Sequence, residues 1–196
     1  MPRLPAAERR AGLIDAAMAV FSAEGYQATT MDAVAAEAGV TKPVLYQHFS
    51  SKRDLFLHLL SEVADRMRTV VVEAVAQAST PREQVQFGFR AYFGFVAAHP
   101  DEFRLLFGEG VRTDEAFSHE VHQLEGEIAA VIAELITIDG ASPPARLALA
   151  HGLVGLAEAT GRHWTLDAGH MDLETVTELV TELAWRGLRG RGVVAD

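Results

Sequence analysis

The stretch TMDAVAAEAGVTKPVLYQHFSSKR, residues 30–53, decides the fold. Thr30 suits the N-cap of a short helix that ends at Gly39. Thr41 suits the N-cap of the next helix, with Pro43 tolerated in its first turn. Two short helices joined by a tight turn make a helix-turn-helix, and we predict one here.

The second of these helices has an apolar side and a side that is free to meet a partner. We expect Val40, Leu45 and Phe49 in the core. The outward residues can enter the major groove of DNA, where side chains read base edges or hold phosphates. A generic helical hairpin, with Tyr and His merely covering the core, fits the same spacing. The DNA-binding candidates are Thr30, Thr41, Lys42, Pro43, Val44, Tyr46, Gln47, His48 and Lys52.

Among these candidates we distinguish readers of sequence from anchors. Lys42 can donate to guanine, Gln47 can contact adenine or a phosphate, and Val44 or Pro43 can rest on a thymine methyl. Thr30, Tyr46 and Lys52 are expected to hold phosphates, which fixes register without reading sequence.

Apolar residues recur at helical spacing on both sides of this stretch, and no segment alternates as a strand does. We therefore predict an all-α chain of about nine helices. A three-helix domain that contains the helix-turn-helix is expected at 1–52, and a second helical domain at 53–196. Outside the motif the helices are expected at 8–24, from 51 to about 79, and at 82–98, 101–108, 114–137, 143–165 and 172–188.

Charge is distributed unevenly along the chain. The 196 residues carry 17 Lys+Arg and 27 Asp+Glu, a net charge of −10. Residues 1–55 are balanced, with six basic and six acidic residues, so the whole excess of acid follows residue 55. Because binding to phosphates requires cations, only the first quarter of the chain is suited to approach nucleic acid.

Several classes of protein are excluded by what the sequence lacks. There is no Cys, so disulfides, thiolate metal sites and Cys nucleophiles are impossible. We find no secretory signal and no long uncharged apolar run, so we expect a cytoplasmic protein that does not cross a membrane. No HExxH, GxSxG, P-loop or GxGxxG motif occurs, so we predict no catalytic site, cofactor or metal. His119 and His122 are interpreted as part of a solvated helix face.

A family resemblance adds to this. It is carried by Ala16, Phe21 and Gly25, by 26–30, by Val34-Ala35 before 38–40, by 41–49 with Ser51-Lys52, and by 99–104. With these residues, 8–60 resemble the DNA-binding domain of the TetR family of bacterial transcriptional regulators. Position 44 departs from the pattern, because relatives often have Thr or Ser there, so the operator sequence cannot be carried over. The resemblance implies a homodimeric regulator, most often a repressor, that binds a double-stranded DNA operator and is released by a small-molecule effector.

The effector pocket is implied for the C-terminal half, but the resemblance assigns no residues to it. Aromatic residues cluster at 87–107 and polar residues interrupt the apolar stretches that follow; both can line a pocket or belong to the core. The acidic excess favours a neutral or cationic apolar effector. A DNA-binding member without an effector, and a helical ligand-binding protein or enzyme, are the alternatives. The ligand-binding candidates are Phe87, Tyr92, Phe103, Phe107, His122, His151, Glu158 and Arg162.

The last two helices are apolar over a wide arc, so they need cover on two sides. Two copies of the pair can form a four-helix bundle around a two-fold axis, which is also what the resemblance implies. Burial within one protomer is the alternative. The dimer-interface candidates are Leu153, Trp164, Leu173, Val176, Val180 and Leu183.

Overall fold

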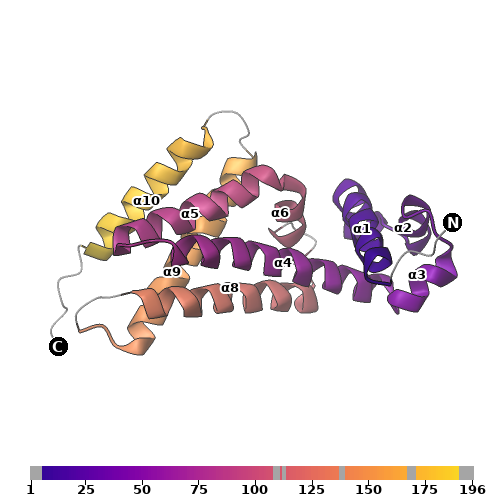
Figure 1. The fold of residues 1–196 in the computed structure, drawn as a ribbon, viewed down its shortest axis with the longest axis horizontal. Coiled ribbons are helices and arrows are strands. Elements are labelled where there is room, and N and C mark those ends of the chain that lie inside the picture. The colour runs from indigo at the N-terminus through magenta and orange to yellow at the C-terminus, as the bar shows by residue number, and fades with distance from the viewer. Residues whose placement is uncertain (1–5, 108–110, 112–113, 137–139, 167–170, 190–196) are drawn as a thin grey trace. The chain divides into compact units, whose positions relative to one another are not determined.

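The computed structural model describes residues 6–107, 111, 114–136, 140–166 and 171–189. Within these ranges the regular structure consists of nine α-helices and no strand, which confirms the all-α prediction (Figure 1). None of the helices in the described part of the chain is both long enough and apolar enough to cross a membrane.

The chain divides into two compact units. The first takes in the described residues of 1–64 and 101–121, and the second those of 65–100 and 122–196. The first unit is larger than the 1–52 segment because the helix that follows the helix-turn-helix is buried there as well. Its apolar face, Leu55, Phe56, Leu59 and Leu60, is at most 3% exposed.

The first unit is built on α1 (Ala6–Ala28), α2 (Met31–Glu37), α3 (Lys42–His48) and the first part of α4 (Lys52–Ala76). The helix expected at 8–24 is interrupted at the next residue, because Gly25 has a φ of +75°, a conformation that favours glycine. The remaining turn of α1 delivers the chain to the start of α2.

Two later segments complete the core of the first unit. They are α6 (Pro100–Phe107) and the first residues of α8 (Glu115–Leu135). Three side chains from these segments are at most 1% exposed, namely Phe103, Leu106 and Phe117. The unit that contains the helix-turn-helix is therefore closed by residues from a distant part of the chain.

The second unit holds the rest of α4 and α8 together with α5 (Pro81–Ala98), α9 (Pro143–Leu166) and α10 (Leu173–Arg189). A capping box starts α5: Glu83 N donates to Thr80 Oγ1 at 3.2 Å, and Thr80 N donates to Glu83 Oε2 at 3.1 Å. Helices α5 and α10 pack side by side (Figure 1).

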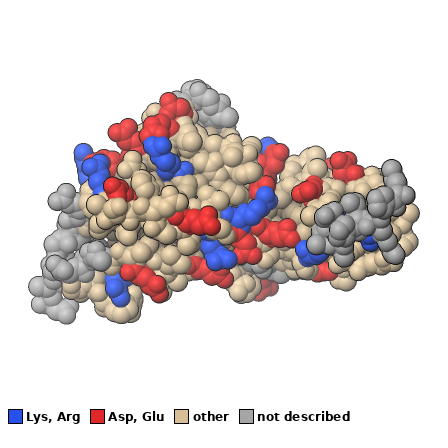
Figure 2. Space-filling view, in the orientation of Figure 1, with Lys and Arg blue, Asp and Glu red and all other residues tan. Residues whose placement is uncertain are grey.

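On the face shown in Figure 2, charged groups of opposite sign lie next to each other rather than in separate fields. In the second unit Arg82 pairs with Glu182 at 3.1 Å, and Arg90 pairs with Glu174, so both pairs join α5 to α10. Exposed pairs of this kind contribute at most about 1 kcal/mol each. Apolar burial, not ion pairing, holds the unit together.

Candidate DNA interface and effector site

The turn between α2 and α3 has the geometry that the sequence predicts. Thr30 caps α2, accepting a hydrogen bond from Ala33 N at 3.1 Å. At the other end Gly39 has a φ of +63°, Val40 N donates to Ala35 O at 2.9 Å and Gly39 N donates to Ala36 O at 3.1 Å. These two bonds form a Schellman motif, which ends α2 and turns the chain into α3.

Helix α3 is anchored by its apolar side and open on the other. Leu45 is 0% and Phe49 1% exposed, whereas the side chains of Lys42, Tyr46 and Gln47 are exposed. Pro43 is also exposed, while Val44 and His48 are half-buried. The structure thus brings the DNA-binding candidates of α3 together on and around one accessible face.

The two threonines next to these helices differ in how their hydroxyls are used. Thr30 accepts a bond through its oxygen, so its O–H proton can still be donated to a phosphate. Thr41 occupies the N-cap of α3, but its side chain makes no capping bond. Its exposed hydroxyl is therefore available to a ligand of α3.

The two lysines have partners that the sequence did not reveal. Lys42 Nζ lies 2.7 Å from Asp32 Oδ2 on α2, and this hydrogen bond raises the pKa of Lys42. Lys52 Nζ donates to three backbone carbonyls at the end of α1, those of Tyr26 (2.8 Å), Gln27 (3.2 Å) and Thr29 (2.9 Å). One lysine is held by an exposed carboxylate and the other by main chain.

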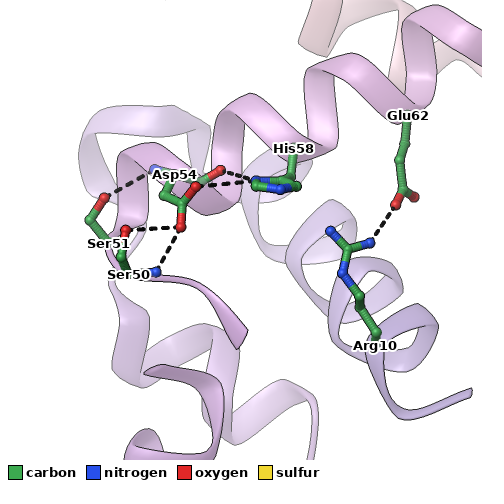
Figure 3. A network of polar contacts seen from close by, with 6 residues as sticks. All are labelled: Arg10, Ser50, Ser51, Asp54, His58 and Glu62. Atoms are coloured by element: carbon green, nitrogen blue, oxygen red, sulfur yellow. Dashed lines mark hydrogen bonds and ion pairs between the residues drawn. The ribbon is translucent and has the colours of Figure 1, made fainter. Parts of the chain in front are cut away.

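The turn from α3 into α4 is fixed by a polar network (Figure 3). Ser51 Oγ accepts from Asp54 N at 3.1 Å, while Asp54 Oδ2 accepts from the amide and hydroxyl of Ser50 at 2.7 and 2.9 Å. These bonds, the one to the Ser50 amide above all, hold the pKa of Asp54 below its ordinary value. Ser51 and Asp54 thus form an arrangement like a capping box, in which the Asp54 carboxylate accepts from Ser50. His58 also contacts Asp54, at 3.2 Å.

The end of α3 is further held by α1. The guanidinium of Arg10 lies 5.4 Å from the centroid of the Phe49 ring. It also pairs with Glu62 at 3.1 Å, as Figure 3 shows. His58 packs edge-on against Phe49 as well, with the two ring centroids 5.5 Å apart. The position of α3 is therefore set by contacts from both α1 and α4.

Within the same unit, the start of α8 contacts the helices that support α3. Arg53 donates two hydrogen bonds to the Asp114 carboxylate, at 3.1 and 3.0 Å. Phe117 packs against Tyr26 and Phe56, with ring centroids 4.8 and 4.7 Å apart. A bidentate pair and an aromatic cluster thus join α8 to α1 and α4.

Comparison with known proteins identifies this arrangement. Residues 13–59 match the model of bacterial regulatory proteins of the tetR family, and residues 81–187 match a tetracyclin repressor-like C-terminal domain. The chain is 33% identical over 187 residues to the HTH-type transcriptional activator FasR of Mycolicibacterium smegmatis, a match that covers 95% of this chain and 85% of the relative. The chain belongs to the TetR family.

Solved structures agree with this assignment. A TetR-like transcriptional regulator from Rhodococcus sp. RHA1 superposes with a TM-score of 0.78 at 31% identity, covering 96% of this chain and all of that one (100%). FadR from Bacillus subtilis, solved in complex with stearoyl-CoA, shares the fold with a TM-score of 0.77 at 18% identity, over 89% of this chain and 97% of its own. As a TetR-family member the protein is a DNA-binding transcriptional regulator and not an enzyme, as predicted.

We predicted an effector pocket in the C-terminal half of this chain. The structure places four of the eight candidates around one polar cluster of the second unit. Glu158 pairs with Arg162 on α9. The charges of both residues influence the pKa of the hydroxyl of Tyr92, which is buried on α5. Burial raises the pKa of Tyr92 well above its ordinary value. The fourth candidate, His122, lies with this cluster but is itself exposed.

Sequence reasoning missed Glu125, which belongs to the same cluster. It is hydrogen-bonded to Glu158, and burial together with this neighbour raises the pKa of Glu125. The signal was available, because Glu125 lies three residues after His122 on α8 and therefore on the same side of the helix. Glu125 therefore keeps its proton to a higher pH than an exposed glutamate does.

The other effector candidates differ in their burial. Phe103 and Phe107 are buried residues of the first unit. Phe87 is half-buried on α5. His151 is exposed on α9, where the helix presents Gly152 and Gly155 to open space.

The expected dimer stripe on α10 needs a correction. Val176 and Val180 are 2% and 6% exposed because that side of α10 packs on α5 of the same protomer. Leu183, by contrast, is 63% exposed, and Leu179, one turn before it, is 57% exposed. On α9 Leu153 packs partly on the Ala129–Ala150 core, and Trp164 donates from Nε1 to Met171 O at 2.8 Å and stacks edge-on against Phe93. Leu173 is half-buried.

Proposed function

We propose that the protein is a homodimeric repressor that places α3 of each protomer in the major groove of a two-fold operator. The observation that carries this is the exposed face of α3 above a fully buried anchor, Leu45 and Phe49. Lys42 and Gln47 are the base-reading residues, and Thr30, Thr41 and Tyr46 hold phosphates. Pro43, Val44 and His48 border this surface. The DNA-binding domain is residues 1–52, and because its partner is chromosomal DNA we place the protein in the cytoplasm.

The operator can be isolated by selection, because the DNA fragments that bind the protein contain the operator sequence. Genomic fragments are selected on the purified full-length protein, and the recovered duplex is titrated by fluorescence anisotropy at several salt concentrations. We expect a two-fold symmetric site with half-sites about one helical turn apart and an affinity that falls as salt rises. Absence of salt-dependent binding to any fragment would remove this proposal.

Dimerisation is assigned to α9 and α10. Leu179 and Leu183 form an exposed apolar stripe, and the exposed Gly152 and Gly155 leave α9 thin enough for another helix to approach. Apolar stripes of this kind are normally covered in the assembled protein. In an isologous, two-fold interface with a second copy of the chain, the stripe of each protomer is covered by the other protomer.

We further propose that the polar cluster of Tyr92, His122, Glu125, Glu158 and Arg162 receives the polar end of an apolar effector with a long hydrocarbon chain. Two findings support this class of ligand. Proteins that share the fold include the Bacillus subtilis protein solved with stearoyl-CoA. Two aromatic side chains, Phe89 and Phe93, are buried on α5, the helix that carries Tyr92. Binding reduces operator affinity by favouring dimers in which the two α3 helices do not match the operator spacing.

The effector proposal is tested by thermal shift followed by operator titration. Stearoyl-CoA is compared with neutral and cationic amphiphiles of equal chain length, because the unit is acidic and its Arg162 is already paired with Glu158. We expect at least one probe to stabilise the protein and to weaken operator binding. Stabilisation without a change in operator affinity would argue for a family member without effector control.

Activation is the second candidate, and a specific observation favours it. The relative that matches 95% of this chain is named a transcriptional activator. Activation and repression are distinguished by a reporter assay in which the operator is moved from a position overlapping the promoter to one upstream of it. Repression by occlusion is expected only from the overlapping site.

A further inference from the structure

Lys52 is the first residue of α4, and its ammonium group lies against the end of α1. The three carbonyls it contacts, Tyr26, Gln27 and Thr29, are 2.8, 3.2 and 2.9 Å away. An ammonium group has three N–H donors, so these bonds occupy the whole of its hydrogen-bonding capacity. Nζ also lies 4.6 Å from the centroid of the Tyr26 ring, which adds a cation–π contact.

Electrostatics explains why the ammonium group of Lys52 lies at the C-terminal end of α1. The last carbonyls of a helix have no amide partner within the helix, and they form the negative end of its dipole. A cation there satisfies the carbonyls and complements the dipole. Lys52 thus caps the C-terminus of α1 from another helix.

We propose that Lys52 is a positioning residue for DNA recognition and not a phosphate ligand, in contrast to the role expected from the sequence. It holds the end of α1 so that α2 and α3 are presented to DNA in one orientation. The proposal rests on the DNA-binding function given above. Its physical basis is the short distance along the chain from the held carbonyl of Thr29 to Thr30, the N-cap of α2.

The segment between α1 and α2 transmits this constraint. Thr29 is 1% exposed and donates from Oγ1 to Gly25 O at 2.9 Å, so its carbonyl and its side chain are both held. Thr30 follows directly, and its hydroxyl is one of the proposed phosphate contacts. Release of the Lys52 bonds would therefore displace a phosphate anchor and the start of α2 together.

The two lysines of the chain make a matched comparison. Lys42 is paired with an exposed carboxylate, that of Asp32, which it can leave to meet DNA. Lys52 would have to abandon a main-chain carbonyl to do so, and that carbonyl would lose its donor. Lys42 is accordingly the phosphate- or base-binding cation and Lys52 the internal one.

The test uses Lys52→Met and Lys42→Met in the full-length protein. Salt dependence is measured with operator and with a random duplex, at a temperature well below unfolding. For Lys52→Met we expect an unchanged salt slope and a specificity ratio, operator over random duplex, that falls about tenfold because α3 is misaligned. For Lys42→Met we expect the slope to fall by up to about one unit.

The outcomes that overturn the proposal are distinct from failure of the DNA-binding function itself. A wild-type protein without salt-dependent binding contradicts the proposed function. Thermal unfolding measured without DNA, the DNA-free arm of the test, still reports on the role of Lys52. In that arm, thermal unfolding of Lys52→Met should occur at a lower temperature than that of the wild type. A slope reduced by about one unit with unchanged stability would show that Lys52 is a phosphate ligand, and an unchanged specificity ratio would show that it does not position α3.

If Lys52→Met does not fold, Lys52→Gln replaces it. The amide keeps two N–H donors, enough for two of the three carbonyls, but carries no charge. We expect Lys52→Gln to recover part of the specificity ratio while leaving the salt slope at the wild-type value. Loss of slope in this variant would also overturn the proposal.

Discussion

At the scale of single residues, the cations next to α3 are distinguished by the internal partners that hold them. Lys42 is held by Asp32, Lys52 by main-chain carbonyls and Arg53 by Asp114. Each of the three is engaged inside the protein before DNA arrives. Use of any of them by DNA must therefore exchange an internal contact, and the exchange at Lys42 costs least because both partners are exposed.

This exchange leads to a prediction for Asp32→Asn. The substitution removes the carboxylate that competes with phosphate for Lys42, and it removes a negative charge beside the DNA surface. An exposed ion pair is worth at most about 1 kcal/mol, so we expect affinity for random duplex to rise by up to about fivefold. Anisotropy titrations in low salt measure the change.

The matched control is Glu37→Asn, which removes an exposed carboxylate from the other end of the same helix α2. We expect a smaller gain from it, since no ion pair with Lys42 is broken. Equal gains in the two variants would show that general charge, and not release of Lys42, is the cause.

The carboxyl pair in the second unit gives a prediction of pH dependence. The pKa of Glu125 is raised by burial and by Glu158, so the folded protein holds this proton at pH values where the unfolded chain has released it. Stability from this group is then lost as pH rises from about 4.5 through the raised pKa. In Glu125→Gln the loss is absent.

Urea unfolding of wild type and Glu125→Gln over this pH range measures the effect. We expect the variant to become more stable relative to wild type as pH increases. Glu134→Gln, at an exposed position of the same helix α8, serves as the control and should run parallel to the wild type. A constant difference between Glu125→Gln and wild type would contradict the raised pKa.

At the scale of helices, the sequence predicts the ends of elements well because caps are local. Thr30, Gly25 and Gly39 act within a few residues of themselves, so pattern and turn chemistry locate them. The partners of Lys52 lie 23 to 26 residues away, and no local rule identifies them. Local periodicity thus predicts the open face of α3, whereas the different roles of Lys42 and Lys52 depend on contacts that only the fold reveals.

The same limit explains the error on α10. Helical periodicity shows that Val176, Val180, Leu179 and Leu183 lie on a wide apolar stripe, but it does not show what covers each edge of it. The fold answers this: α5 covers the edge with the valines, and the leucines remain exposed. The exposed apolar surface of α10 that is open to the proposed dimer contact is therefore narrower than the sequence suggested.

From this follows a prediction for assembly. Leu179→Glu with Leu183→Glu places two charges in the proposed interface without touching the protomer core, so we expect a folded protein that is monomeric at micromolar concentration. Val70→Glu, at an exposed apolar position of α4, is the control and should remain dimeric. Sedimentation measures the state and circular dichroism the fold; a double variant that stays dimeric would exclude this stripe as the interface.

At the scale of the whole molecule, regulation requires that an effector and DNA influence each other. Coupling is reciprocal: a tenfold loss of operator affinity on effector binding, about 1.4 kcal/mol, requires a tenfold weaker effector affinity on the operator complex. Helix α8 takes part in both compact units. Phe117 belongs to the aromatic cluster of the first unit, and Glu125 belongs to the polar cluster of the second.

We therefore predict that the Arg53–Asp114 pair at the start of α8 contributes to this coupling. Asp114→Asn removes the charge while the Asn side-chain oxygen can still cap α8, where Asp114 Oδ1 accepts from Phe117 N at 3.3 Å. The exposed pair is worth up to about 1 kcal/mol, so we expect the effect of the effector on operator affinity to fall by up to about fivefold. The affinity of the DNA-free protein for the effector should not change. Arg68→Met, which breaks a pair with Glu127 of α8 inside the second unit, is the control and should keep the wild-type coupling. Operator titrations with and without effector give the coupling ratio, and a wild-type ratio in Asp114→Asn would exclude this pair from the regulatory route.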